Sequence, residues 1–269
     1  MSAPALVLVA HGTRSAKGVQ MIAALAEAVA RELGAPVPAF GPGAEFPGTG
    51  AGAAFGAAST PLRDNGIEGP RVRTAFVDVL GPSPAEVLRD LGDVPAVLVP
   101  AFLASGYHVY RDVPREVAAS AHAAVAVTRA MGPDPALAAV MRMRLRAAGW
   151  RPGDAVVFAA AGSSDARARH DVRRAAGLLA DQIAAPVRVA YIATGEPRVP
   201  EVVAELRAAG AKRVFLASYL LAHGLFHERL HAAGADGVAD PIGVHPAVVR
   251  LLADRYHAAA GALATARVA

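Results

Sequence analysis

The residues best suited to metal or proton chemistry in this chain are two histidines that follow apolar runs. His11 comes directly after the run Ala5–Ala10, and His108 follows the run Val97–Leu103 by a few residues. Neutral imidazole binds Fe, Co, Ni and Zn, and it is also a base near neutral pH. Both histidines therefore qualify as metal ligands or as general bases. On position alone, His11 could equally cap a helix or form a hydrogen bond in the core.

Asp78 is a third candidate, because it lies inside the apolar stretch Ala75–Leu80, which is predicted to be a strand. A carboxylate in a strand costs free energy unless it is paired, bound to a metal or close to the solvated end of the strand. Two interpretations remain open for Asp78. It forms an ion pair with an arginine, or it serves the same site as the histidines.

A second group of histidines, His223, His227 and His231, has a spacing of four residues. Residues at this spacing share one face of a helical turn, as some metal ligands do. His223 follows an apolar run that ends at Leu221, close to the predicted edge of a sheet. The spacing is compatible with a contact between His223 or His227 and metal or substrate, and also with ordinary structural positions.

The elements that must position these residues alternate between apolar, β-branched runs and longer alanine-rich stretches. In chain order, the first half contains the following predicted strands and helices: Ala5–Ala10, Gln20–Leu33, Arg73–Leu80, Ser83–Leu91, Ala96–Leu103, Val113–Ala121 and Ala136–Ala148. This order predicts a parallel sheet with helices on both faces. Open α/β sheets bind ligands at the carboxyl ends of their strands, where His11 and His108 are expected to converge.

The second half of the chain repeats the first. Matching segments occur in the same order, pairing Leu6–Gly18 with Val156–Ala168, Ala75–Leu88 with Ala190–Val203, Val97–Val109 with Phe215–His227, and Gly132–Ala136 with Gly243–Ala247. Such a repeat indicates a duplicated unit. The sequence therefore predicts an α/β protein of two pseudo-symmetric lobes, each a parallel sheet flanked by helices. Residues 1–150 are the predicted N-terminal lobe with the active site, and residues 151–269 a degenerate duplicate.

The three candidate residues are missing from the second copy. His11 corresponds to Ala161, Asp78 to Ala193, and His108 to Phe226. Because the scaffold recurs without them, we expect the three to serve one chemical site rather than the fold of each lobe.

Residues 38–70, rich in glycine, proline and alanine, have no counterpart in the second half. A structureless run of this length is uncommon inside a compact domain. It predicts a flexible surface insertion, and a lid over the site is the alternative.

The composition limits the function classes. The chain is 54% hydrophobic and 19% charged, has a formal net charge of +4 and contains no cysteine. The lack of cysteine excludes disulfides, thiolate zinc sites and cysteine-ligated iron–sulfur clusters. The arginines are scattered and not interleaved with aromatic residues, which argues against nucleic-acid binding. No signal peptide or membrane-spanning run is recognised, so we expect a cytoplasmic protein without a membrane partner.

Together these motifs resemble the sirohydrochlorin chelatases of the CbiX/SirB type, which are class II chelatases with the ferrochelatase-like fold. The resemblance covers both halves apart from residues 38–70. Its motifs are His11-Gly12-Thr13-Arg14 after the first strand, Asp78 followed by Gly81-Pro82-Ser83-Pro84, and the stretch from Pro100 through Gly106-Tyr107-His108-Val109 to Asp112-Val113-Pro114. The family often has glutamate at the position of Asp78, and aspartate shortens the reach of the carboxylate.

The resemblance implies a lyase that inserts a divalent metal, Fe2+ or Co2+ with Ni2+ also compatible, into sirohydrochlorin in siroheme or cobalamin biosynthesis. No organic cofactor is implied. His11, His108 and Asp78 would handle the metal and the ring protons. The tetrapyrrole would be bound by Thr13, Arg14, Ser15, Gly106, Tyr107 and Arg111. A chain with both lobes would act as a monomer. The alternative is a non-catalytic carrier of a tetrapyrrole or metal with the same fold.

Overall fold

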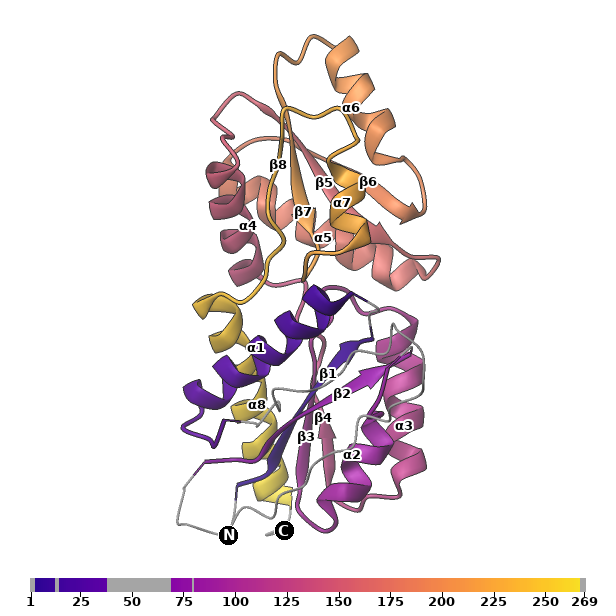
Figure 1. Cartoon of the computed structure of the whole chain (residues 1–269), viewed down its shortest axis with the longest axis vertical. Coiled ribbons are helices and arrows are strands. Elements are labelled where there is room, and N and C mark those ends of the chain that lie inside the picture. The colour runs from indigo at the N-terminus through magenta and orange to yellow at the C-terminus, as the bar shows by residue number, and fades with distance from the viewer. Residues whose placement is uncertain (1–2, 13–14, 38–68, 79, 267–269) are drawn as a thin grey trace. The chain divides into compact units, whose positions relative to one another are not determined.

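The structure is a computed structural model that describes residues 3–12, 15–37, 69–78 and 80–266. Within these residues the chain forms two compact units, and each contains a four-stranded parallel sheet (Figure 1). The first unit takes in the described parts of 1–102, 107–130 and 249–269, and the second takes in 103–106 and 131–248. The predicted α/β class, with two lobes of parallel strands and flanking helices, is confirmed. The predicted insertion at 38–70 falls almost wholly outside the described residues.

The first half of the chain contains the elements up to the fourth helix. They are β1 (Ala5–His11), α1 (Ala16–Glu32), β2 (Val72–Val77), α2 (Pro84–Leu91), β3 (Ala96–Pro100), the π-helical turn η1 (His108–Asp112), α3 (Val113–Ser120), β4 (Val125–Val127) and α4 (Pro135–Ala147).

The second half repeats this order without the π-helical turn. Its elements are β5 (Ala155–Gly162), α5 (Ala166–Ile183), β6 (Val187–Thr194), α6 (Val199–Ala208), β7 (Val214–Tyr219), α7 (Leu225–Leu230), β8 (Gly237–Val238) and α8 (Pro246–Ala266).

The two sheets have the same topology, which confirms the repeat seen in the sequence. Their strand orders are β2-β1-β3-β4 and β6-β5-β7-β8. The registers also correspond, because Val7 of β1 pairs with Leu98 just as Val157 of β5 pairs with Leu216. Counting forward from Leu98 and Leu216 sets His108 against Phe226, the equivalence expected from the sequence.

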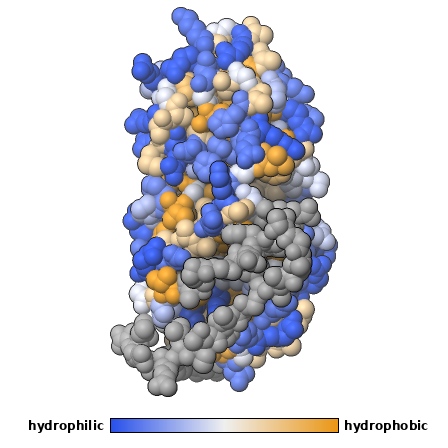
Figure 2. Space-filling model, in the orientation of Figure 1, coloured by the Kyte–Doolittle hydropathy of each residue, from blue (hydrophilic) through white to orange (hydrophobic). Residues whose placement is uncertain are grey.

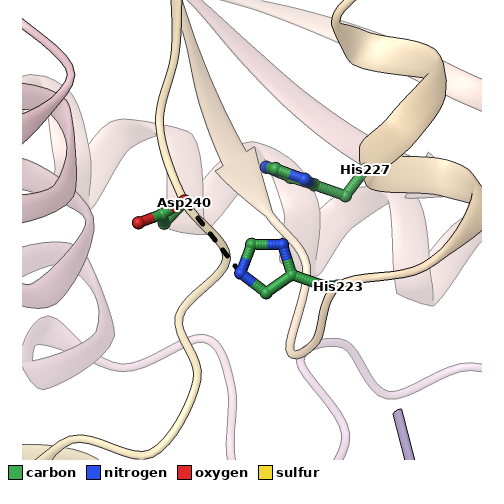
Figure 3. Close-up of side chains that lie close together, drawn as sticks. All are labelled: His223, His227 and Asp240. Carbon is green, nitrogen blue, oxygen red and sulfur yellow. Dashed lines mark ion pairs between the residues drawn. The ribbon is translucent and has the colours of Figure 1, made fainter. Parts of the chain in front are cut away.

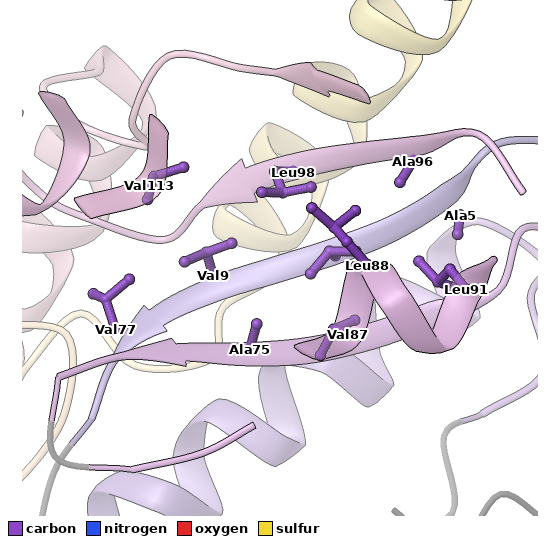
Figure 4. Close-up of a cluster of buried hydrophobic side chains, with 11 residues drawn as sticks. Ala5, Val9, Ala75, Val77, Val87, Leu88, Leu91, Ala96, Leu98 and Val113 are labelled. Atoms are coloured by element: carbon purple, nitrogen blue, oxygen red, sulfur yellow. The ribbon is translucent and has the colours of Figure 1, made fainter. Parts of the chain in front are cut away.

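The strands are long apolar runs because both of their faces are covered. Residues 5–10 of β1 are fully buried, as expected for a central strand of a parallel sheet. On one face, Val9 and Ala75 pack with Leu88 of α2 and with Val113 of α3 (Figure 4). The amphipathic helix α1 contributes a buried stripe at Ile22, Leu25, Ala26 and Val29.

The last helix of each half packs in the unit formed mainly by the other half. Helix α4 packs against α5 and β7 in the second unit. From Val249 onward, α8 belongs to the first unit, where the Tyr256 hydroxyl donates a hydrogen bond of 2.7 Å to the carbonyl of Pro4. The boundary predicted at 150/151 follows the sequence repeat, whereas the compact units divide the chain differently.

The surface of the described residues is mixed. On the visible face, hydrophobic residues are scattered among hydrophilic ones (Figure 2). Scattered apolar residues are normal on a globular surface. None of the helices in the described part of the chain has the length and hydropathy needed to span a membrane.

Candidate functional site

Three side chains gather at the carboxyl ends of neighbouring strands in the first unit. His11 is the last residue of β1, Asp78 directly follows β2, and His108 begins η1 on the segment that follows β3. Because β1 lies between β2 and β3 in the sheet, the three residues emerge at one edge. The convergence expected from the sequence is therefore present in the structure.

The three side chains are close together and open to solvent. The His11 and His108 rings meet edge to face, with centroids 4.8 Å apart. The His11 Nε2 atom lies 3.7 Å from Oδ2 of Asp78, and these side chains are 48% and 57% exposed. Such an exposed pair contributes little to stability. The open arrangement leaves the imidazole and carboxylate groups accessible to a ligand.

Hydrogen bonds indicate the tautomer of both rings. The His11 Nδ1 lies 2.7 Å from the carbonyl oxygen of Gly12, which can only accept, so Nδ1 carries the proton. The His108 Nδ1 likewise lies 2.6 Å from Oδ2 of Asp112, and an ionised carboxylate only accepts. In this arrangement each neutral ring keeps a lone pair on Nε2, the atom that binds a metal or takes a proton.

Asp112 is a residue of the site that the sequence analysis did not identify. It is buried, it bonds to His108, and its Oδ1 also lies 3.2 Å from Nη2 of Arg115. A carboxylate that holds the second nitrogen of a histidine is the usual support of a metal-binding imidazole. The spacing of four residues between His108 and Asp112 was a signal that could have found it.

The backbone around Asp78 is tightly packed. The prediction that Asp78 lies inside a strand was wrong, because β2 ends at Val77 and Asp78 adopts a positive φ of 64°. Ladder pairing stops there, and the chain turns toward Gly12 at the end of β1. A Cβ on Gly12 would lie 2.6 Å from the carbonyl oxygen of Asp78, so only glycine fits. Among the described residues, no arginine forms an ion pair with Asp78, and the His11 ring nearby would form one only when it is protonated.

The structure places some of the predicted tetrapyrrole-binding residues. Tyr107 is exposed, and its ring centroid lies 6.3 Å from that of His108. Arg111 is exposed on η1. Ser15 is the N-cap of α1 and accepts a hydrogen bond from the amide of Gly18. Thr13 and Arg14 lie outside the described residues.

Gly106 differs from these residues because it belongs to the second unit. A Cβ at this position would come within 3.3 Å of the Cβ of Ala168. Close packing therefore accounts for this glycine, and its predicted contact with the tetrapyrrole stays a prediction.

A separate polar cluster lies in the second unit and contains His223, His227 and Asp240 (Figure 3). The His223 and His227 rings meet edge to face, with centroids 4.7 Å apart. His227 is buried, and this burial lowers its pKa below the ordinary value for histidine. The next histidine, His231, is exposed, and its ring centroid is 5.1 Å from that of His227.

Comparison with known proteins identifies the family. The CbiX family model matches residues 54–148 and 155–259, so two successive matches cover most of the chain. The chain belongs to the CbiX family. A search of curated proteins gave no match.

Solved structures of similar fold include chelatases. SirB from Bacillus subtilis with Fe3+ is 20% identical, with a TM-score of 0.73 over 97% of this chain and 96% of that one. SirB from Bacillus subtilis subspecies spizizenii in complex with cobalt has the same identity and coverage and a TM-score of 0.68. CbiX, described as the terminal enzyme for siroheme biosynthesis in denitrifying bacteria, is 21% identical, with a TM-score of 0.62 over 95% and 99% of the two chains. These similarities establish the chelatase fold over both units.

Proposed function

We propose that this protein is a sirohydrochlorin chelatase that inserts Fe2+ or Co2+ into the tetrapyrrole in siroheme or cobalamin biosynthesis. The observation that carries the proposal is the pair His11 and His108, whose rings meet with each Nδ1 held by a hydrogen bond, and with the carboxylate of Asp78 close to Nε2 of His11. Membership of the CbiX family supports the class of reaction. Chelatases of the same fold have been solved with Fe3+ and with cobalt, which supports the choice of metal.

The side chains of His11, His108 and Asp78 suit the chemistry of metal insertion. Insertion of M2+ into the free ring forms bonds from the metal to the ring nitrogens and releases two pyrrole N–H protons. Imidazole binds all of the candidate metals and also accepts protons near neutral pH. His11 and His108 can hold the incoming ion and take up protons, and Asp78 adds a negative charge beside them. One general base contributes about 10²–10⁴-fold to a rate, so positioning of the ring must supply much of the rest.

We also propose that the protein is a monomer and that it is cytoplasmic. Both copies of the duplicated unit are present in one chain, which supports the monomer. Tetrapyrrole contacts are assigned to the exposed Tyr107 and Arg111, together with Ser15, Thr13, Arg14 and Gly106. The rings of Tyr107 and Tyr110 offer flat apolar area, since both are exposed.

The test is anaerobic incubation with sirohydrochlorin and Fe2+, Co2+ or Ni2+, followed by absorption spectroscopy. We expect insertion by the wild type, and we expect His11→Ala and His108→Ala each to lower kcat by about 100-fold or more. The matched control is His257→Ala, an exposed histidine of α8, which should leave the rate unchanged.

Two results would contradict the proposal. Unchanged rates in both His11→Ala and His108→Ala would remove the assigned site. Failure of the wild type to insert any of the three metals, with retained tetrapyrrole binding, would establish the carrier function instead.

A further inference from the structure

The second unit contains a set of potential metal ligands apart from the site of the proposed reaction. His223, His227 and Asp240 each offer one ligand atom, and these atoms all lie within 4.8 Å of one another. Two imidazoles and one carboxylate form a donor set suited to divalent ions such as Co2+ or Zn2+.

Neighbouring strands bring these residues together. His223 follows β7 on the way into α7, His227 lies within α7, and Asp240 lies just beyond β8. Because β7 and β8 are adjacent and parallel, the segments that follow them start from the same edge of the sheet. Figure 3 shows the three side chains gathered there, with His223 facing Asp240 across an ion pair of 4.0 Å.

The environment of His227 is that of a ligand held in place. Its Nε2 atom lies 3.2 Å from the carbonyl oxygen of Ala239, which can only accept a hydrogen bond. Nε2 therefore carries the proton, and Nδ1 keeps its lone pair. A histidine anchored through one nitrogen to a backbone carbonyl is the usual arrangement of a metal-binding imidazole.

The other two ligands can adjust to an ion. The side chains of His223 and Asp240 are 53% and 60% exposed, so an ion and its water molecules can reach them. Ligand bonds of about 2.1 Å place tetrahedral neighbours roughly 3.4 Å apart. Separations of up to 4.8 Å exceed this spacing by at most about 1.4 Å, which movement of the two exposed side chains closes.

Comparison of the two halves shows that this donor set is not part of the repeated scaffold. The equivalent strand registers set His223 against Ser105, His227 against Val109, and Asp240 against Arg129. The first half thus has a cation where the second has a carboxylate. The two halves therefore carry different side chains at equivalent positions along this sheet edge.

We propose that His223, His227 and Asp240 bind one divalent transition-metal ion, of the class of Co2+ or Zn2+, with a ligand set that does not include His11 or His108. Water completes its coordination. The site does not depend on the proposed chelatase activity, because its ligands belong to the second unit.

The experiment is a Co2+ titration of the full-length chain, followed by visible absorption of the bound ion. The variant His11→Ala/His108→Ala is used as background, so that the first site does not contribute. We expect this variant to bind one Co2+ per chain. Adding His223→Ala or Asp240→Asn should weaken that binding by about 100-fold or more, since each removes a direct ligand. The matched control, His231→Ala, removes the neighbouring histidine outside the set and should bind Co2+ unchanged.

Circular dichroism of each variant checks that it is folded, which the exposure of His223 and Asp240 leads us to expect. The proposal is overturned if the background variant binds no Co2+, or if neither His223→Ala nor Asp240→Asn weakens binding. An equal loss in His231→Ala would also overturn the assigned ligand set. Since this titration uses a chain without His11 and His108, its outcome is independent of metal insertion.

Discussion

The hydrogen bond between His108 and Asp112 determines which nitrogen of the imidazole is available. With Nδ1 held at 2.6 Å from the carboxylate, Nε2 is left as the reactive atom. The carboxylate is itself buried and lies beside the guanidinium of Arg115. In the proposed reaction Asp112 is therefore a positioning residue, which would act on the metal through His108.

Replacing Asp112 by asparagine tests this role. An Asn side chain can present its NH2 to Nδ1, which favours the opposite tautomer and blocks Nε2. We expect Asp112→Asn to lower kcat for metal insertion by roughly 10–100-fold, with little change in KM for the tetrapyrrole. Stopped-flow absorption measurements give both constants.

A control on the same helix separates positioning from folding. Glu116 also lies beside Arg115, and it accepts a hydrogen bond from the amide of Ala85 rather than from His108. Glu116→Gln should leave kcat unchanged. If it reduces kcat as much as Asp112→Asn does, the effect is structural and Asp112 has no special role.

At this scale, the sequence located His11, Asp78 and His108 because they interrupt a repeat that otherwise continues as Ala161, Ala193 and Phe226. Asp112 was missed for a physical reason. The helix was predicted to begin at Val113, so His108 and Asp112 were not expected to share a helical turn, whereas the turn η1 already begins at His108.

At the scale of single elements, the side chain of Asp236 stabilises the first residue of β7, Val214. Oδ2 of Asp236 accepts hydrogen bonds of 2.8 Å from the amide of Val214 and of 3.0 Å from Arg207. The Val214 hydrogen bond and the charge of Arg207 hold the pKa of Asp236 below its ordinary value of 3.8. The folded state therefore binds a proton less readily than the unfolded state.

The sign of the pH effect follows from linkage. The stabilisation from Asp236 is complete above the unfolded pKa of 3.8 and is lost as the pH falls through the lower folded value. Asp236→Asn should lower the Tm at pH 7 by roughly 2–4 °C, which corresponds to about 1 kcal/mol. The variant should also lose less stability than the wild type below about pH 4.

Thermal melts from pH 3 to pH 7 measure both effects. Asp181→Asn, at an exposed position of α5, is the control and should follow the wild type. A parallel loss of stability on acidification in wild type and Asp236→Asn would show that this carboxylate does not contribute.

The order of strands and helices could be predicted well, because both faces of the sheets are buried and their strands are unbroken apolar runs. The end of β2 could not be predicted from the sequence. The apolar pattern continues through Val79 and Leu80, whereas the positive φ of Asp78 ends the strand at Val77. A single backbone conformation overrides the pattern.

On the scale of the whole molecule, each sheet depends on a helix encoded in the other half. Helix α4 places Leu137, Val140, Met141 and Leu145 in the core of the second unit. Burial of such a side chain contributes about 1.5–3 kcal/mol, so four of them amount to much of the roughly 5–15 kcal/mol that stabilises a domain.

Separate production of residues 1–150 and 151–269 tests this dependence. We expect neither fragment to melt cooperatively alone, and we expect a mixture of the two to recover a 1:1 complex with a cooperative transition. Light scattering and calorimetry are the measurements. The intact chain is the control and should have the mass of one 27.4 kDa chain. A fragment 1–150 that melts like the intact chain would contradict the dependence.

The duplication itself could be read from the sequence, since matching segments recur in order. The exchange of helices could not, because an apolar helix face shows that a helix is buried but not which sheet it covers. Only the path of the chain decides which sheet each one covers.

The packing of α8 in the first unit also affects how the chain folds while it is being translated. The strands of the first sheet are complete once residue 127 has been made, but the portion of α8 that belongs with them begins only at Val249. At about 5–20 residues per second, the nascent first unit waits on the order of 10 s at the ribosome with part of its apolar surface uncovered. The unit made first is thus completed last, and this interval is when a chaperone would be needed most.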